Sequence, residues 1–329
     1  MTKKATSSLE AYDLYLLGRH LWAKRQPQDL PKVFELFQQA IEKDPGYALA
    51  HCGMADYYLY QGYYFGNLPF IEAMTKAREY AQKALALDHN LGEPHLSLGL
   101  VKLWLDWDFV GAGRELARVL ELNSTYPTGY HFRALQIWST GQRLEDALAL
   151  CQRGLEVDPL SVPIHNIRAI ILSQAGQHDR VIAEAKRILE LDPHNVWEYL
   201  GRAYEKTGRP DEAVHWYLRW LQEDGAKPDT LVKLQQAYEQ EGLAGFHRRN
   251  AQLLVDRMDQ LPLARHWQQG YLLQAYARLG RKDDAFRLLE QCFAERSPLM
   301  AWLKVDLRLE LLRDDPRFSV LLKRIGFPE

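Results

Sequence analysis

The segment WEYLGRAYEKTGRPDEAVHWY, residues 197–217, constrains the fold of this chain more than any other stretch. Its first half places residues at the i, i+3, i+4 and i+7 positions of one helix face: Trp197, Leu200, Gly201 and Tyr204. Gly208 then interrupts the pattern, and Ala213 and Tyr217 resume it on a second helix. We therefore predict two antiparallel helices joined by a short turn. Such a hairpin cannot bury its apolar faces alone and needs stacked neighbours.

The same hairpin recurs along the chain. When the small residue that opens each second helix is aligned with Ala213, a turn follows in every unit at a similar distance. The predicted turn positions are Pro45, His89, Ser124, Pro159, Pro193, Gly225, Asp259 and Ser297. Their separations are 44, 35, 35, 34, 32, 34 and 38 residues, so eight hairpins fit one register. We predict one continuous all-α array, because a repeat array grows by addition and needs no globular boundary.

Glycines occupy two kinds of position in this register. Four lie where two helices would approach most closely, because only a small side chain permits that approach: Gly18, Gly53, Gly99 and Gly201. Five others are predicted to end the first helix of a unit: Gly62, Gly176, Gly208, Gly242 and Gly280. Three histidines align with Trp197 and are predicted to pack there and to hydrogen-bond locally: His51, His95 and His165.

The W-x2-L-G-x2-Y spacing of residues 197–204, followed by A-x3-Y, resembles the tetratricopeptide repeat (TPR). Further segments are similar to the C-terminal TPR arrays of bacterial winged-helix transcription regulators, serine/threonine kinases and nucleotide cyclases: AYDLYLLGRHLW, DPGYALAHCGMAD, LWLDWDFVGAGREL, ERSPLMAWLKVD and DDPRFSVLLKRIGFPE. The resemblance implies an all-α, right-handed superhelical solenoid of about eight TPR hairpins with a C-terminal helical cap. This sequence has no kinase or recognition-helix motif, so we expect a stand-alone relative or the sensor region of a regulator.

The predicted boundaries follow from this register. We expect a flexible N-terminus over residues 1–8, the TPR array over residues 9–297 and the cap over residues 298–329. Related arrays have prolines at the positions of Leu307 and Leu311, so we expect a more continuous helix in this cap. Asp315 and Pro316 are predicted to begin a last helix, which ends at Gly326.

One hairpin departs from the regular length. After Gly62 the chain has about ten residues more than the repeat needs, and the extra piece, YYFGNLPFIEAM, is aromatic. In one interpretation residues 63–76 lengthen the two helices, and Tyr63, Tyr64 and Phe65 pack on a neighbouring unit. In the other interpretation the segment projects as a loop and offers an apolar contact surface.

Composition argues against several partner classes. The net charge of −2 provides no field for holding a phosphate backbone, so we expect no nucleic-acid binding by the chain itself. No apolar stretch is long enough to span a membrane, and we expect no membrane partner. The three cysteines, Cys52, Cys151 and Cys292, are too few and too widely spaced for a disulfide framework or a paired metal site. A reducing, cytoplasmic location fits this cysteine usage.

No enzymatic chemistry stands out either. The GAGREL sequence at residues 111–116 lacks the third glycine of a dinucleotide-binding loop and follows a helical pattern, so we predict no cofactor. No pair of histidines has metal-ligand spacing, and no set of nucleophile and base is distinguished from the repeat register. We therefore predict no metal site and no catalytic residues.

Binding is the function that remains. In TPR arrays the first helices line the concave surface, and those positions of this chain are apolar and aromatic in the N-terminal units and polar from Asn166 onward. We predict a partner-binding groove lined by Tyr12, Tyr15, Arg19, Trp22, Asp56, Tyr60, Leu100, Trp104, His131 and Trp138. The favoured function is a non-enzymatic interaction, scaffold or sensor module that binds a peptide, a helix or a partner domain. The alternative is a small-ligand receptor that uses the same aromatic trough, or the regulatory part of a signalling or transcription-control protein.

Overall fold

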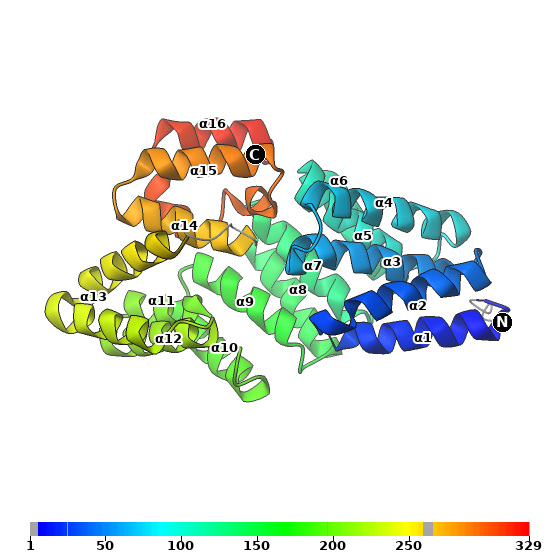
Figure 1. The fold of residues 1–329 in the computed structure, drawn as a ribbon, viewed down its shortest axis with the longest axis horizontal. Coiled ribbons are helices and arrows are strands. Elements are labelled where there is room, and N and C mark those ends of the chain that lie inside the picture. Colours follow the sequence, from blue (N-terminus) through cyan, green and yellow to red (C-terminus); the bar gives the residue numbers. More distant parts are fainter. Residues whose placement is uncertain (1–5, 25, 196, 259–265, 329) are drawn as a thin grey trace. The chain divides into compact units, whose positions relative to one another are not determined.

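The computed structural model describes residues 6–24, 26–195, 197–258 and 266–328, and every regular element in those ranges is helical (Figure 1). The all-α class predicted from the sequence is therefore confirmed. The chain divides into two compact units. Unit 1 comprises residues 1–125 with 294–300, and unit 2 comprises residues 126–293 with 301–329.

Unit 1 contains three consecutive helical hairpins. α1 (Leu9–Ala23) pairs with α2 (Leu30–Lys43), α3 (Ala48–Tyr60) pairs with α4 (Phe70–Leu87), and α5 (Gly92–Val101) pairs with α6 (Phe109–Leu122). α2 also packs on α3, and α4 packs on α5, so that each hairpin is joined to the next. The first helices α1, α3 and α5 contact one another in series. They form one face of the unit, and this is the face on which the sequence predicts partner binding.

Unit 2 continues the pattern. Its helices are α7 (Pro127–Ser139), α8 (Leu144–Val157), α9 (Val162–Gln174), α10 (His178–Leu191), α11 (Glu198–Lys206), α12 (Pro210–Glu223), α13 (Pro228–Met258), α14 (His266–Arg278) and α15 (Lys282–Ala294). Gly242 interrupts α13 with a φ of 64°, so α13 supplies two helical segments. Each predicted turn position falls between two helices, except Asp259, which lies outside the described residues.

The predicted close-packing glycines are confirmed by the space around them. A Cβ atom added to Gly18 or Gly53 would lie 2.6 Å or 2.8 Å from the ring of Phe37. One added to Gly99 would lie 2.8 Å from Leu116. Phe37 is fully buried, so its ring on α2 occupies the space that the glycines of α1 and α3 leave open. Any larger residue at these positions would push the helices apart.

Replacing Gly201 with alanine is expected to lower the free energy of unfolding by about 1–3 kcal/mol. The new methyl group would lie 2.6 Å from the ring of Tyr217, which is itself buried. Gly92 provides a matched control, because its added Cβ would lie 3.6 Å from the nearest atom, an ordinary contact. Gly92→Ala should be neutral or slightly stabilising. Urea denaturation followed by circular dichroism measures both variants, and equal midpoints would contradict the close approach at Gly201.

The extra residues after Gly62 lengthen both helices of their hairpin. α3 continues as a π-helical turn over Gln61–Phe65, and α4 spans 18 residues. The predicted helix end at Gly62 is wrong, because a Cβ there would lie 2.7 Å from that of Ala73 and the left-handed stop is Gly66, with a φ of 65°. Gly62 is thus a close-packing glycine. The other four predicted stops all have positive φ: Gly176, Gly208, Gly242 and Gly280.

Trp197 does not take the buried position predicted for it. α11 begins only at Glu198, so Trp197 is the N-cap residue and has 45% of its surface exposed. Its indole N–H donates to Asn195 Oδ1 at 2.5 Å. The buried face of the hairpin therefore starts at Leu200 and Tyr204, which are 2% and 4% exposed.

The three histidines aligned with Trp197 pack and hydrogen-bond locally, as predicted. His51 and His165 are buried, and each holds its Nε2 atom 3.1 Å from the carbonyl oxygen of the proline six residues earlier. His165 also bonds the buried carboxylate of Glu184 through Nδ1. His95 Nδ1 lies 2.8 Å from Glu115 Oε2. These contacts give all three rings a packing role.

The C-terminal segment is more broken than expected. It contains two short 3₁₀-helices, Pro298–Trp302 and Leu307–Leu312, followed by α16 (Pro316–Ile325). The prediction of a more continuous helix here is wrong. Asp306 is 7% exposed, and its carboxylate accepts from the Arg308 backbone N–H and pairs with the Arg308 guanidinium at 2.6 Å. A buried carboxylate needs such donors, and an N-cap turn provides them.

The predicted limits of the last helix are confirmed. Asp315 is the N-cap residue of α16, and its side chain accepts a hydrogen bond from the backbone N–H of Arg317. Pro316 occupies the first helical turn, and Gly326 ends the helix in the left-handed conformation, with a φ of 78°. Local capping chemistry is therefore sufficient to place this helix.

Candidate functional site

The ten residues predicted to line a binding groove divide into two groups by burial. Four have exposed fractions of 9% or less: Trp22, Leu100, Trp104 and Trp138. Six are at least partly exposed: Tyr12, Tyr15, Arg19, Asp56, Tyr60 and His131. His131 and Trp138 belong to unit 2, and the other eight belong to unit 1. All three tryptophans of this set are covered by other side chains.

Five aromatic rings of unit 1 touch in series, and we call them the aromatic ladder: Trp22, Tyr60, Tyr64, Tyr63 and Trp104. Trp22 meets Tyr60 edge-on with 4.6 Å between ring centroids, and Tyr60 stacks on Tyr64 at 4.5 Å. Tyr64 meets Tyr63 edge-on at 4.7 Å, and Tyr63 stacks on Trp104 at 4.0 Å. Both arrangements are favourable for aromatic rings. The two terminal tryptophans are buried, whereas the three tyrosines between them are half-buried.

Two helical extensions bring the ladder together. The π-helical turn after α3 carries Tyr63 and Tyr64, and a second π-helical turn, Lys102–Asp106, continues α5 and carries Trp104. Because both helices are longer than a regular repeat helix, aromatic rings at the ends of two neighbouring hairpins of unit 1 come into contact. The interpretation in which the extra segment packs on the neighbouring hairpin is confirmed for Tyr63, which stacks on Trp104. The side chain of Phe65 is not among those that the structure describes. The aromatic run after Gly62 was the signal for these contacts.

Polar groups accompany the ladder on the same face. Arg19 of α1 and Asp56 of α3 form an ion pair with 2.7 Å between Nη1 and Oδ2. Tyr15 packs against Phe37 and Tyr47, and burial raises the pKa of its phenol well above the usual value, so the hydroxyl stays protonated. The α1/α3/α5 face therefore offers aromatic rings and one fixed pair of opposite charges.

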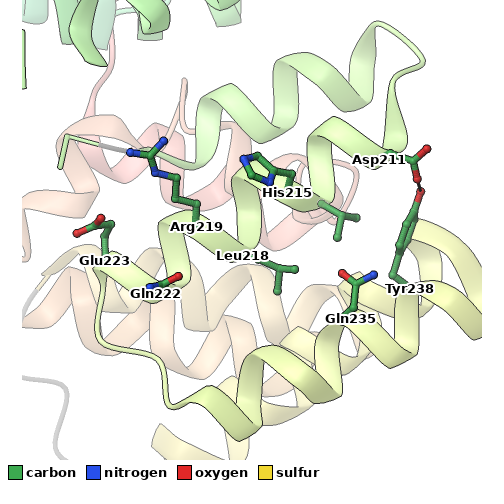
Figure 2. Close-up of a pocket in the computed structure, with 9 residues that line it drawn as sticks. Asp211, His215, Leu218, Arg219, Gln222, Glu223, Gln235 and Tyr238 are labelled. Atoms are coloured by element: carbon green, nitrogen blue, oxygen red, sulfur yellow. Dashed lines mark hydrogen bonds between the residues drawn. The ribbon is translucent and has the colours of Figure 1, made fainter. Parts of the chain in front are cut away.

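A hollow lies in unit 2, between α12 and the first segment of α13 (Figure 2). It is an open groove with a volume of about 450 Å³. Its lining consists of Asp211, Val214, His215, Leu218, Arg219, Gln222, Glu223, Gln235 and Tyr238. The Tyr238 hydroxyl donates to Asp211 Oδ1 at 2.5 Å and links the two helices. We call this hollow the α12/α13 groove. No sequence pattern pointed to it, because it forms between two successive hairpins.

A hydrogen-bonded cluster connects α11, α12 and the second segment of α13. Glu205 Oε2 accepts from the Tyr217 hydroxyl at 2.9 Å and lies 2.9 Å from His247 Nε2. Burial by itself raises the pKa of Glu205. The hydrogen bonds from His247 and Tyr217 and the charge on His247 outweigh this effect and lower the pKa to about 2. The carboxylate is therefore ionised at neutral pH and holds three helical segments together.

We compared the chain with proteins of known sequence and structure. No family model matches the chain. The chain is 28% identical over 157 residues to the transcriptional regulator HilA of Salmonella typhimurium, a match that covers 46% of this chain and 27% of HilA. It is 32% identical over 101 residues to the small glutamine-rich tetratricopeptide repeat-containing protein 2 of Mycosarcoma maydis, covering 30% of this chain and 28% of that protein. The chain thus spans little more than a quarter of the length of these curated relatives.

Solved structures share the fold at low sequence identity. The type IV pilus biogenesis factor PilW aligns with a TM-score of 0.54 and 17% identity, over 70% of this chain and all of PilW. PilF of Pseudomonas aeruginosa aligns with a TM-score of 0.50 and 16% identity, over 66% of this chain and 93% of PilF. The chain has the tetratricopeptide-repeat fold.

The glycines of the GAGREL motif serve this TPR architecture. The motif lies at the start of α6, where Asp108 is the N-cap residue and accepts from the Gly111 backbone N–H at 2.7 Å. A Cβ at Gly111 would lie 1.9 Å from the Asp108 carboxylate, so the absence of a side chain at Gly111 makes room for this cap. In the described residues, no group of three His, Cys, Asp or Glu side chains could hold a metal ion. None of the helices in these ranges has the length and hydropathy of a membrane span.

Replacing Glu205 with glutamine is expected to destabilise the TPR array in a pH-dependent manner. Because folding lowers the pKa of Glu205 from 4.5 to about 2, its carboxylate stabilises the folded state fully above the unfolded pKa. That contribution is lost as the pH falls through the window between those two values. Parent and variant should therefore differ most at pH 7 and converge as the pH falls below 4. Urea denaturation at several pH values measures the difference, and a constant difference would contradict the role of the charge.

Proposed function

We propose that this chain is a non-enzymatic interaction module, a scaffold or sensor that binds a peptide, a helix or a partner domain on the α1/α3/α5 face of unit 1. The aromatic ladder is the observation that carries the proposal. Its three tyrosines are half-buried, so each ring is fixed by its neighbours and still reaches the surface. Ordered rings lose little entropy when a partner packs on them, and tyrosine is enriched among residues that dominate binding.

The buried tryptophans support the tyrosines in this proposal. Trp22 and Trp104 close the two ends of the ladder and hold Tyr60 and Tyr63 in place. A partner would therefore contact the tyrosine rings of the ladder together with Tyr12, which is 43% exposed. The ion pair between Arg19 and Asp56 lies on the same helices and would orient a polar group of the partner.

The reactive side chains support a non-enzymatic role. Burial raises the pKa of the Cys52 thiol well above its usual value and that of Cys151 to about 12, so neither forms much nucleophilic thiolate at neutral pH. Burial lowers the pKa of His131 to about 4, so this ring stays neutral. Buried, protonated thiols also fit the cytoplasmic location that we propose, and a net charge of −2 fits a protein or peptide partner better than a nucleic acid.

The similarity to HilA supports a regulatory setting. HilA is a transcriptional regulator, and regulators of this class are one of the settings in which the sequence resemblance places such TPR arrays. We propose that this chain transmits a binding event within a signalling or transcription-control system. Its partner would then be a protein component of that system.

A small-ligand receptor is the second candidate function, and the α12/α13 groove favours it. Its volume of about 450 Å³ is within the range of small-molecule sites. Its lining combines the apolar side chains of Val214 and Leu218 with polar side chains from both helices. The groove lies in unit 2, so the two candidates can be tested separately.

Photo-crosslinking tests which face holds the partner. A photoreactive phenylalanine derivative replaces Tyr64 on the ladder in one variant and Gln222 in the α12/α13 groove in the other. After irradiation in cells, we expect the Tyr64 variant to capture one discrete protein and the Gln222 variant to capture none. Tyr64→Ala should then weaken binding of that protein by about 30-fold, as loss of a main contact residue does, with the unfolding midpoint nearly unchanged. Capture of a protein at Gln222 alone would contradict the proposal, because the partner would then bind at the α12/α13 groove of unit 2.

A further inference from the structure

The outward face of α1 carries apolar side chains that nothing in the described structure covers. α1 buries Ala11, Gly18 and Trp22 on one side. On the opposite side Leu9, Leu16 and Leu17 have 74%, 45% and 48% of their surface exposed. Three leucines on one solvent-facing helix cost solubility, so their presence on a well-packed helix points to a contact.

Two polar side chains interrupt this apolar face at regular positions. Asp13 and His20 are both exposed. Residues 9, 13, 16 and 20 recur at spacings of four, three and four, the spacing of a seam along which two helices pack side by side. We call Leu9, Asp13, Leu16, Leu17 and His20 the α1 seam. The acid lies in its N-terminal half and the imidazole in its C-terminal half.

We propose that the α1 seam binds the α1 seam of a second copy of this chain, with the two helices antiparallel. With Leu16 opposite Leu17 of the second copy, Asp13 falls opposite the second copy's His20, and His20 falls opposite its Asp13. Each polar pair then joins a carboxylate to an imidazole. The two pairs lie on either side of a central cluster formed by Leu16 and Leu17 of both copies. A parallel arrangement would place Asp13 against Asp13 and is disfavoured by repulsion. A two-fold contact requires such a self-complementary surface.

The rest of unit 1 holds α1 in place for this contact. Ser8 caps the helix by accepting from the Ala11 backbone N–H, and Gly18 packs directly on Phe37. Lys43 of α2 pairs with Glu10 at 2.8 Å, so that this carboxylate is already engaged within the chain. The seam is therefore presented on a rigid helix, and association does not have to order it.

The size of the seam sets the strength of the dimer. α1 has 15 residues and is about 22 Å long. A single pair of helices this short buries less area than the roughly 1,200 Å² of a standard stable interface. The expected dimer is therefore weak and in rapid exchange, with a dissociation constant in the micromolar range or above. The proposal is independent of the aromatic ladder, because none of its residues belongs to the ladder.

Sedimentation velocity of the full chain from about 10 to about 500 μM tests the proposal, a range that spans weak association. The parent should shift from monomer toward dimer as concentration rises. Leu16→Asp should remain monomeric throughout, with an unchanged circular dichroism spectrum. Leu160→Asp is the matched control, because Leu160 is 62% exposed but lies in unit 2, and it should dimerise like the parent.

A charge exchange tests the antiparallel register. Asp13→Lys and His20→Glu should each weaken self-association by at least about tenfold, because each removes or reverses both polar pairs. Mixing these two variants in equal amounts should restore dimerisation, because the introduced lysine of one chain then meets the introduced glutamate of the other and the remaining pair is native. A parent that stays monomeric at every concentration would overturn the proposal. So would a dimer that Leu16→Asp leaves intact, or a mixture that associates no better than its components.

Discussion

Replacing Trp104 with alanine is expected to destabilise the protein by about 3–5 kcal/mol, the usual cost of deleting a large aromatic side chain from a core. Trp104 is 1% exposed, and its ring is stacked on Tyr63 at 4.0 Å. Removing it leaves a cavity at the end of the aromatic ladder and frees Tyr63 from its fixed position. Urea denaturation followed by circular dichroism measures the change.

Trp197→Ala is the matched control for this prediction. Trp197 is 45% exposed, and its loss removes one hydrogen bond to Asn195 but no buried packing. Its effect should stay within about 1 kcal/mol. If Trp104→Ala were as mild as Trp197→Ala and abolished partner binding, Trp104 would contact the partner directly. The proposal that Trp104 only holds Tyr63 in place would then be wrong.

Ending the chain after Ser297 is expected to produce aggregation, or a fall of more than about 10 °C in the thermal midpoint. The deleted segment, residues 298–329, is the proposed C-terminal cap. Four of its leucines are fully buried: Leu299, Leu303, Leu309 and Leu312. Its loss would also uncover Trp138, which packs on Trp302 at 5.6 Å between ring centroids, and Phe293, which lies 3.9 Å from the Arg324 guanidinium. Size-exclusion chromatography and thermal denaturation measure these effects.

A shorter deletion controls for the loss of the C-terminus itself. Ending the chain after Phe327 removes Pro328, whose carbonyl oxygen accepts from Lys304 and Gln142, but no buried leucine. This variant should stay soluble with a similar midpoint. A chain ending at Ser297 that is monomeric and equally stable would show that residues 298–329 do not cover the array, and the segment would become a candidate docking element.

The repeat register could be read from the sequence because it depends on local chemistry. Helix periodicity, the close-packing glycines and the capping residues each act over a few positions. Gly53 leaves room for Phe37 of the preceding helix, and Asp315 begins α16 whatever that helix later packs against. The hairpins therefore follow from spacing alone. The same periodicity indicated polar positions from Asn166 onward, but not the contact between Glu205 and His247, which are 42 residues apart.

Exposure was decided by the tertiary structure. The sequence predicted Trp197 on a buried helix face and Trp104 and Trp138 in a partner-binding groove. In the structure Trp197 is 45% exposed, whereas Trp104 and Trp138 have exposed fractions of 9% or less. Whether a ring is covered depends on segments that are distant in sequence: Trp302 covers Trp138, and Tyr63 from a lengthened helix covers Trp104. Periodicity states which face of a helix is apolar, but it does not state what packs on that face. The sequence alone thus determined where the hairpins lie, and only their packing determined which aromatic rings remain available to a partner.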